Sequence, residues 1–218
     1  MSNIRNVGVI LSGGRGVRAG HGLPKQYHKV CGKMIIEYVI EAFKQSAQTD
    51  VILVAAEPGY FEELKAIGCI CVEGGRERNE TVRNVINYVK ENLSECEKIL
   101  FHDSARPQIT PQYIDECFEL LENHDSVITT AHITDSLSHR EFGPVERSEY
   151  YLIQTPEAFQ FGILEKHFTK ESEWTAIVQQ LPSGADVYLN YNLAKNMKIT
   201  YPEDFGYFQM LVEGGYLK

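Results

Sequence analysis

Short apolar segments alternate with segments of helical periodicity along the first 131 residues of this chain. The apolar segments have the length of buried strands: Val7–Leu11, Val51–Ala55, Ile70–Val72, Ile99–His102 and Val127–Ala131. The intervening segments carry apolar residues at helical spacing: Met34–Gln45, Tyr60–Ile67, Glu80–Asn92 and Pro111–Asn123. This alternation predicts an α/β fold, in which helices cover both faces of a parallel sheet to give three layers.

The alternation breaks at residues 133–151, which are polar and contain Gly143 and Pro144 near their middle. Strand-like pieces on both sides predict a projecting β-arm, and the commonest partner of such an arm is another subunit. Apolar periodicity then returns in Ala176–Leu181, Val187–Leu189 and Phe205–Val212. Because the 218 residues contain no repeat or linker, we expect a single domain spanning residues 1–218, with 133–151 as its arm.

The charged residues are distributed unevenly along the chain. Residues 1–33 contain no Asp or Glu but hold six cations: Arg5, Arg15, Arg18, Lys25, Lys29 and Lys33. The remaining residues carry 15 basic and 30 acidic side chains, a net charge of −15, so the whole chain has a net charge of −9. An acidic chain is a poor ligand for nucleic acid or an anionic membrane surface, and we expect neither as a partner.

Other sequence features exclude further classes of protein. The apolar segments are far shorter than the ~20 residues that span a bilayer, and no leader-like segment precedes the first predicted strand, so we expect a cytoplasmic protein. The five cysteines form no Cys-x-x-Cys pair, which predicts reduced thiols in the core. The seven histidines lack the spacing of zinc ligands.

A glycine-rich loop follows the first predicted strand. Gly13, Gly14 and Gly16 are accompanied by the cations Arg15, Arg18 and Lys25. Open α/β sheets bind ligands at the carboxyl ends of their strands, where glycines allow backbone N–H groups to approach an oxyanion. Together with the cations, this loop predicts a polyphosphate site.

Two other interpretations of this loop are weaker. Gly14–Ala19 matches the dinucleotide pattern G-x-G-x-x-A, but Gly20, Gly22 and Pro24 interrupt the helix that this pattern should open. No Gly-Lys-Ser/Thr follows, so the loop is not a Walker A motif. The remaining alternative is a plain glycine turn with solvated cations. The six cations of residues 1–33, which contain no acidic residue, argue against it.

Further motifs follow in a fixed order along nearly the whole chain. They are Ile10–Arg18, Leu23–Tyr27, Gly74–Val82, His102–Pro107, Thr134–Ser136, Val145–Arg147, Gln154–Pro156, Asn196–Thr200 and Pro202–Asp204. As an ordered set, these motifs resemble the CTP-dependent polyol-phosphate cytidylyltransferases, which include methylerythritol-phosphate and ribitol-5-phosphate cytidylyltransferases.

The resemblance implies a Rossmann-like nucleotidyltransferase fold and a homodimer that exchanges its β-arms. It also implies a reaction in which CTP and a polyol phosphate give a CDP-polyol and pyrophosphate. The phosphate oxygen of the acceptor would attack the α-phosphorus in line, so catalysis would consist of positioning and charge stabilisation.

The resemblance also implies a role for each matching residue. Arg18, Lys25 and Lys198 would be the catalytic cations, the first two at the triphosphate and the third near the α-phosphate. The nucleotide would be bound by Ser12, Gly13, Gly14, Arg15 and Gly16 and, around the cytidine, by Gly75, Arg78 and Thr81. Asp103 would hold Mg²⁺. Arg106 would bind the polyol phosphate, and Ser136 and Arg147 would reach the acceptor of the neighbouring subunit from the arm.

The sequence departs from the family pattern at Ala176, because an acidic residue usually follows the Thr found here as Thr175. Glu171 or Glu173 would have to replace that acid by a shift. The departure indicates an acceptor other than methylerythritol phosphate, or a polyol held through fewer polar contacts. His102–Pro107, Arg78–Asn79 and Asn123–Asp125 resemble the ribitol-type branch slightly more, which favours a ribitol-5-phosphate-like acceptor for a surface polymer. The alternatives are 2-C-methyl-D-erythritol 4-phosphate, for isoprenoid synthesis, and a catalytically weakened nucleotide-binding relative.

Overall fold

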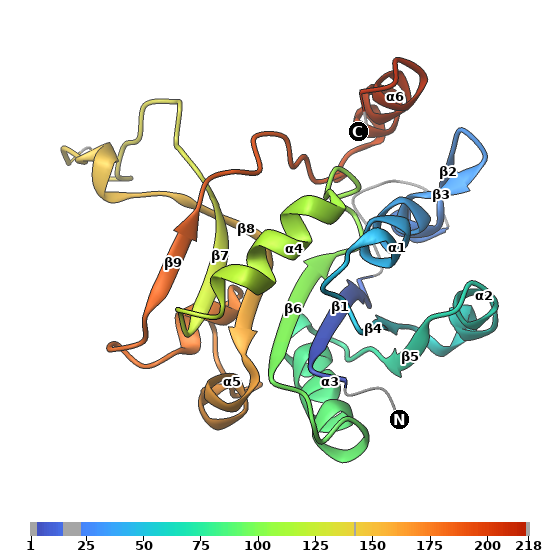
Figure 1. The fold of residues 1–218 in the computed structure, drawn as a ribbon. Helices are drawn as coiled ribbons and strands as arrows, with labels where there is room; N and C mark the ends of the chain where they lie inside the picture. The colour runs from blue at the N-terminus through green and yellow to red at the C-terminus, as the bar shows by residue number, and fades with distance from the viewer. Residues whose placement is uncertain (1–3, 15–22, 142, 217–218) are drawn as a thin grey trace.

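A mixed sheet forms the centre of the molecule. The computed structural model describes residues 4–14, 23–141 and 143–216. Within them, seven strands pair in the order β5-β4-β1-β6-β8-β7-β9 (Figure 1). The strands are β1 (Asn6–Ser12), β4 (Val51–Ala56), β5 (Ile70–Glu73), β6 (Lys98–Asp103), β7 (Ser126–Ala131), β8 (Leu152–Gln160) and β9 (Val187–Asn190). A separate two-stranded ribbon consists of β2 (Lys29–Val30) and β3 (Lys33–Met34).

The half of the sheet formed by β5, β4, β1 and β6 is parallel, as the alternation predicted. Successive side chains of its strands enter opposite layers. Val9 packs in the cluster on one face of the sheet, and its neighbour Ile10 packs in the cluster on the other face. Both side chains are fully buried. Burial on both faces explains why these strands are continuously apolar rather than alternating.

The predicted parallel sheet becomes mixed at β8, which pairs antiparallel with both β6 and β7. No crossover helix separates β7 from β8, so the chain returns beside β7 in the opposite direction. β8 contains Pro156, which lies where the β7–β8 register shifts, between the pairs Ile128↔Glu157 and Thr129↔Gln154. A proline is tolerated in a strand at such an irregularity, because no ladder hydrogen bond from its nitrogen is needed there.

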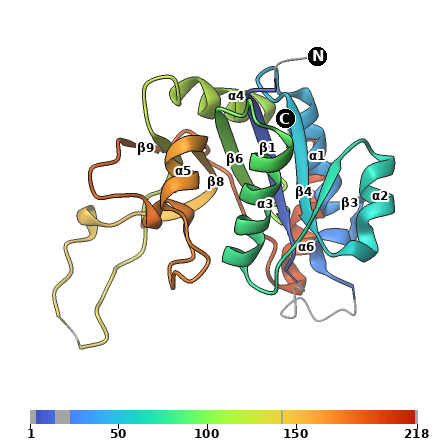
Figure 2. The ribbon, with the colours of Figure 1, turned by 90° about the horizontal axis from the view of Figure 1, so that it is seen from below.

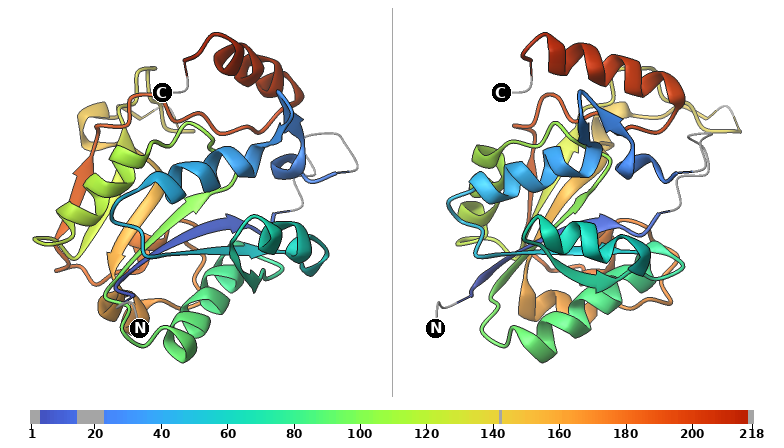
Figure 3. Two further views of the ribbon diagram at one scale, coloured as in Figure 1. Left: turned by 45° about the vertical axis from the view of Figure 1, so that its right-hand side comes forward. Right: turned by 90° about the vertical axis from the view of Figure 1, so that its right-hand side faces the viewer.

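Helices cover the two faces of the sheet, which confirms the three-layer architecture (Figures 2 and 3). The helices are α1 (Ile35–Gln45), α2 (Phe61–Ala66), α3 (Arg78–Asn92), α4 (Pro111–Leu120), α5 (Phe161–His167) and α6 (Pro202–Glu213). One core contains Phe43 of α1 and Phe118 of α4, and the other contains Ile86 of α3 and Leu164 of α5. At the start of α4, Thr110 accepts a hydrogen bond from the Tyr113 N–H at 3.2 Å, ahead of a proline at the first helical position.

Residues 133–141 and 143–151 leave the sheet between β7 and β8 and project from the body (Figures 1 and 2). The described part of this arm contains the 3-10 turn Arg147–Glu149 but no strand. The predicted excursion is therefore present, whereas the prediction that it is a β-arm is wrong for the described residues. Polar residues without alternating apolar positions give such a segment no sheet face to bury.

The C-terminal helix α6 packs beside the β2–β3 ribbon rather than on the main sheet (Figure 3). Phe208 is its buried residue, in a small cluster with Val30, Ile35 and Ile199. Among the described helices, none is both long and apolar enough to cross a membrane.

The described cysteines are all free thiols. Cys69 and Cys117 are buried, while Cys71 and Cys96 are half-buried. Cys31 is exposed, with a positive φ of 50°, in the turn between β2 and β3. The expectation of core thiols is therefore wrong for Cys31, because the turn keeps this side chain outside the core.

Candidate functional site

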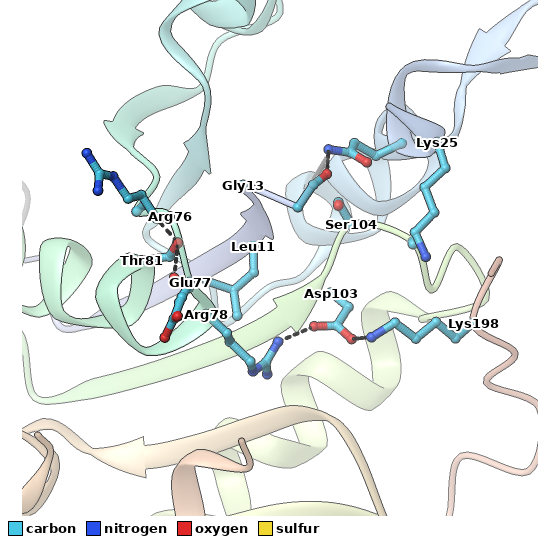
Figure 4. A pocket seen from close by; sticks show the side chains of 14 residues that line it. Leu11, Gly13, Lys25, Arg76, Glu77, Arg78, Thr81, Asp103, Ser104 and Lys198 are labelled. Carbon is cyan, nitrogen blue, oxygen red and sulfur yellow. Dashed lines mark hydrogen bonds and ion pairs between the residues drawn. The ribbon is translucent and has the colours of Figure 1, made fainter. Parts of the chain in front are cut away.

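A cavity of about 280 Å³ lies at the carboxyl ends of β1 and β6 (Figure 4). This is the edge of the sheet at which the sequence placed a ligand. Its lining includes many of the predicted residues: Gly13, Gly14, Lys25, Gly75, Arg78, Thr81, Asp103 and Lys198. We call this space the nucleotide cavity, after the role predicted for its glycine loops.

The two glycine-containing loops of the nucleotide cavity are pressed against each other. A Cβ on Gly74 would lie 3.2 Å from the Cα of Gly13, and a Cβ on Gly13 would lie 3.2 Å from Oγ1 of Thr81. Side chains at these positions would push the loops apart. The glycines therefore keep backbone close to the cavity, which suits a ligand that contacts main-chain groups.

Asp103, the last residue of β6, is the centre of a cluster of cations at the cavity. Arg78 Nη1 lies 2.6 Å from Oδ1, Lys198 Nζ lies 2.7 Å from Oδ2, and Arg106 Nε lies 3.7 Å from Oδ2. Figure 4 shows Arg78 and Lys198 approaching the carboxylate from opposite sides. Burial opposes ionisation of Asp103, but these cations hold its pKa well below the usual range.

Lys25 comes from the 3-10 turn Lys25–Tyr27 and also lines the nucleotide cavity. Its ammonium donates a hydrogen bond to the carbonyl of Ile199, next to Lys198 in the chain. The N-terminal and C-terminal motifs thus meet at one edge of the sheet, although 174 residues separate these two partners.

A second cavity, of about 180 Å³, adjoins the first. Arg78, Asp103 and Lys198 line both cavities, so the cation cluster forms the wall between them. The other lining residues of the second cavity are Arg106, Ile153, Gln154, Thr155, Glu157, Thr175 and Ala176. Because cations stand at the boundary and polar groups lie beyond it, the pair of cavities suits two phosphate-bearing ligands held side by side. We call the second space the acceptor cavity.

Comparison with known proteins agrees with this geometry. Residues 7–214 match the sequence profile of the family described as IspD, 2-C-methyl-D-erythritol 4-phosphate cytidylyltransferase. The chain belongs to the IspD family. This confirms the resemblance that the ordered motifs carried.

Among the IspD relatives, the 2-C-methyl-D-erythritol 4-phosphate cytidylyltransferase of Bacteroides thetaiotaomicron is 31% identical over 212 residues, which cover 90% of this chain and 94% of that protein. The bifunctional enzyme IspD/IspF of Ruegeria is 32% identical over 207 residues, 90% of this chain. The bifunctional ribulose 5-phosphate reductase/CDP-ribitol pyrophosphorylase Bcs1 of Haemophilus influenzae is 30% identical over 182 residues, 77% of this chain. The chain spans only 53% and 38% of the lengths of these two bifunctional proteins.

The fold agrees with a solved IspD structure as well. The 4-diphosphocytidyl-2C-methyl-D-erythritol synthase of Anaerococcus prevotii superposes with a TM-score of 0.82 at 20% identity, covering 97% of this chain and all of that one. At this identity the likeness establishes the shared Rossmann-like nucleotidyltransferase fold.

Some predicted IspD site residues lie apart from the nucleotide cavity or outside the described residues. Arg15, Gly16 and Arg18 fall outside the described residues. Ser12 is buried and does not line the nucleotide cavity, because its hydroxyl donates to the Tyr27 hydroxyl at 3.1 Å. Ser12 was predicted to bind nucleotide, and the structure instead shows its side chain packed within the core.

Thr81 does line the cavity, but its hydroxyl is engaged within the protein. It accepts from the Gly75 N–H at 2.9 Å and donates to the carbonyl of Glu77 at 3.0 Å. Thr81 lies in the first turn of α3, which begins at Arg78 with Glu77 as N-cap. The structural role of Thr81 is to fix the loop that borders the cavity.

The two predicted arm residues, Ser136 and Arg147, are exposed and line neither cavity of this chain. Arg147 Nη1 donates to the carbonyl of Thr134 at 2.9 Å, within the arm itself. The sequence assigned both residues to the site of a second subunit. That assignment stays a prediction.

No role was predicted for the residues that hold the cluster from behind, although Thr155 and Asn196 lie within motifs of the ordered set. Thr155 Oγ1 accepts from the Asp103 N–H at 3.0 Å, and Asn196 Nδ2 donates to the Thr155 carbonyl at 2.8 Å. The Asn196 carbonyl in turn accepts from Arg106 Nη1 at 2.6 Å. Glu157, fully buried on β8, was also missed. In the sequence, Glu157 is distinguished only as a single acidic residue beside the apolar residues Ala158 and Phe159.

A magnesium ion at Asp103 is compatible with the donor set. A carboxylate offers about four lone-pair positions, and the close contacts with Arg78 and Lys198 occupy two of them. Mg²⁺ is commonly bound by one or two carboxylates together with substrate phosphates. In the described part of the chain no three or more His, Cys, Asp or Glu side chains are grouped to hold a metal. An ion at Asp103 would therefore depend on phosphate oxygens of the ligand.

Proposed function

We propose that this protein transfers the cytidylyl group of CTP to the phosphate of a polyol phosphate, giving a CDP-polyol and pyrophosphate. The observation that carries the proposal is the cluster around Asp103, whose cations form the wall between two adjoining cavities. Membership of the IspD family supplies CTP as the nucleotide.

The reaction needs no covalent intermediate with the protein. A phosphate oxygen of the acceptor forms a bond to the α-phosphorus of CTP, and the bond to the bridging oxygen breaks, so the electron pair leaves with pyrophosphate. In this scheme Lys25 and Arg18 stabilise the leaving charge, Lys198 stabilises the α-phosphate, and Arg106 holds the acceptor phosphate. The contribution of the protein is positioning and charge stabilisation.

Mg²⁺ would be held by Asp103 and, when bound, would neutralise charge on the triphosphate. Two residues of the chain fix the position of the carboxylate that would bind the ion. Arg78 and Lys198 hold the Asp103 carboxylate at the boundary between the cavities, and its lowered pKa keeps it ionised at neutral pH.

For the acceptor we propose 2-C-methyl-D-erythritol 4-phosphate first. The matching family profile and the Bacteroides relative, 94% of which the chain covers, carry that name. These similarities outweigh the ribitol-type preference drawn from short motifs in the sequence.

A ribitol-5-phosphate-like acceptor is the second candidate. The observation that favours it is Ala176 on the wall of the acceptor cavity, where the family pattern has an acid. The Haemophilus relative named as a CDP-ribitol pyrophosphorylase is 30% identical.

The experiment is pyrophosphate release from CTP and Mg²⁺ with each acceptor phosphate in turn, with ATP, GTP and UTP as nucleotide controls. We expect turnover with CTP and 2-C-methyl-D-erythritol 4-phosphate. Turnover with D-ribitol 5-phosphate alone would select the second candidate. Nucleotide binding without turnover of either would refute the enzymatic proposal and favour a weakened nucleotide-binding relative.

A further inference from the structure

Glu157 is a buried carboxylate of the acceptor cavity for which the proposed reaction has no use. It lies on β8 and lines the cavity together with Ile153, Gln154 and Thr155 of the same strand. Its side chain is only 2% exposed. An acid in such a place is costly unless its charge is matched, so its partners are informative.

The partners of Glu157 leave part of the carboxylate available. Oε2 accepts from the Val178 N–H at 3.0 Å, and the Ile177 N–H also favours the charged form. Oε1 faces Arg78 Nη2 at 3.5 Å, the outer limit of a hydrogen bond. Arg78 makes its short contact, of 2.6 Å, with Asp103 instead. A carboxylate has about four acceptor positions, so Glu157 has at least one left for a ligand donor.

The chemistry around Glu157 differs from that at the boundary between the cavities. Arg106 and Lys198 supply positive charge for a phosphate, whereas Gln154 and Thr155 near Glu157 supply neutral polar groups. Ala176 lines the same cavity and offers only a methyl group. Glu157 is thus the second carboxylate of this cavity, beside Asp103, and it meets the cation cluster at Arg78.

From this geometry we infer that Glu157 accepts a hydrogen bond from a hydroxyl group of the polyol and selects acceptors that carry this hydroxyl. This inference deepens the proposed function and rests on it. In this chain Glu157 of β8 would supply the carboxylate contact to the polyol, because Ala176 stands where the family pattern has an acid. The occupant of this end of the cavity is the hydroxylated carbon chain, while the acceptor phosphate lies at Arg106.

The test compares wild-type protein with Glu157→Gln on 2-C-methyl-D-erythritol 4-phosphate, D-ribitol 5-phosphate and monodeoxy analogues of each. Wild-type pyrophosphate release tests the proposed function by itself. For Glu157 we expect the variant to raise the KM of the preferred acceptor at least about tenfold while the KM of CTP stays within twofold. Wild-type protein should discriminate against one monodeoxy analogue about tenfold, and the variant should not.

The double variant Glu157→Gln/Ala176→Asp adds a rescue. An acid at position 176 should recover part of the lost acceptor affinity. Glu165→Gln, which alters a half-buried acid of α5 paired with Lys90, is the matched control and should change none of these constants.

The inference would be overturned by an unchanged acceptor KM in a variant whose thermal unfolding matches the wild type. It would also be overturned if the variant changed the constants for CTP and all acceptors equally, since Glu157 would then act only by positioning Arg78. Loss of discrimination for one hydroxyl is a result that a purely structural role would not produce.

Discussion

Asp103 and Lys198 are 95 residues apart in the chain, yet Lys198 Nζ lies 2.7 Å from Asp103 Oδ2. Asp103 ends a central strand, and Lys198 lies in the irregular segment between β9 and α6. The ion pair ties the C-terminal part of the chain to the carboxyl edge of the sheet. It also places one anion among cations that would otherwise repel one another.

Asp103→Asn removes the charge from the centre of this cluster. Asp103 is buried but its partners Arg78 and Lys198 are partly exposed, so the variant leaves cations that water can still screen, and we expect the free energy of unfolding to fall by about 2 kcal/mol. Turnover of CTP should fall at least about 10²-fold, because the cations lose their common anchor. Urea unfolding and pyrophosphate release measure the two effects. Normal stability in the variant would contradict the view of Asp103 as the structural centre of the cluster.

Lys25→Ala removes a cation from the nucleotide cavity. If Lys25 stabilises the leaving pyrophosphate, kcat should fall about 10²-fold or more. Steady-state kinetics with CTP as the varied substrate measure this. Lys29→Ala, an exposed lysine on β2, is the control and should leave kcat unchanged. Equal kinetics for the two variants would refute the role given to Lys25.

The arm prediction is testable by subunit mixing. Ser136 and Arg147 line neither cavity of their own chain, so Arg147→Ala should impair the site of a second subunit. If Arg147→Ala and Lys25→Ala are each inactive, a mixture should regain activity, up to about one quarter of wild type for one restored site per heterodimer. Native mass spectrometry verifies exchange. No recovery in verified heterodimers would rule out a shared site.

Glu157 links stability to pH. Burial raises its pKa from 4.5 to about 6, despite the opposing effect of Arg78. The folded state therefore binds more protons than the unfolded state in this window, and wild-type protein loses about 2 kcal/mol from this group as pH rises from 4 to 7.5. Glu157→Gln does not titrate, so its stability relative to wild type should increase by that amount over the same range. Urea unfolding at both pH values measures the difference, and a constant difference would contradict the raised pKa.

We expect the reactivity of each cysteine thiol to depend on its exposure. Burial raises the pKa of Cys69 to about 11 and that of Cys96 to about 12, so both remain protonated at pH 8. Cys31 is exposed in its turn. Native protein should therefore release about one equivalent of thionitrobenzoate rapidly from Ellman's reagent, and Cys31→Ser should abolish that phase. A second rapid equivalent would contradict the burial of the other thiols.

The α/β class was predictable because it rests on local patterns. Strands such as β1, buried on both faces, are continuous apolar runs, and α1 and α3 carry apolar residues at helical spacing. The direction of β8 was not predictable in this way. Its sequence contains Pro156 and polar residues, and its orientation follows from the absence of a crossover helix after β7 rather than from its own composition.

The site was predictable where a motif places a residue at the end of a strand, as for Asp103, or beside a glycine turn, as for Lys25. What the sequence could not show is which hydrogen bonds each residue makes. Ser12 donates into the core, and Thr81 is bound within its own loop. Glu157 escaped notice because its role depends on Arg78 and Val178, partners that only folding brings to it.

The reversed direction of β8 has a consequence for how the substrate range can change. Because β8 runs against β6, its first residues, rather than its last, lie at the edge that holds Asp103. Those first residues follow directly on the arm, which ends at Tyr151. Insertions or deletions in the arm would thus shift the positions of Ile153 and Thr155, while the parallel strands that carry the glycine loops stay in place. Under the proposed function, new acceptors would be accommodated through changes in the arm, without rebuilding the strands and glycine loops of the nucleotide cavity.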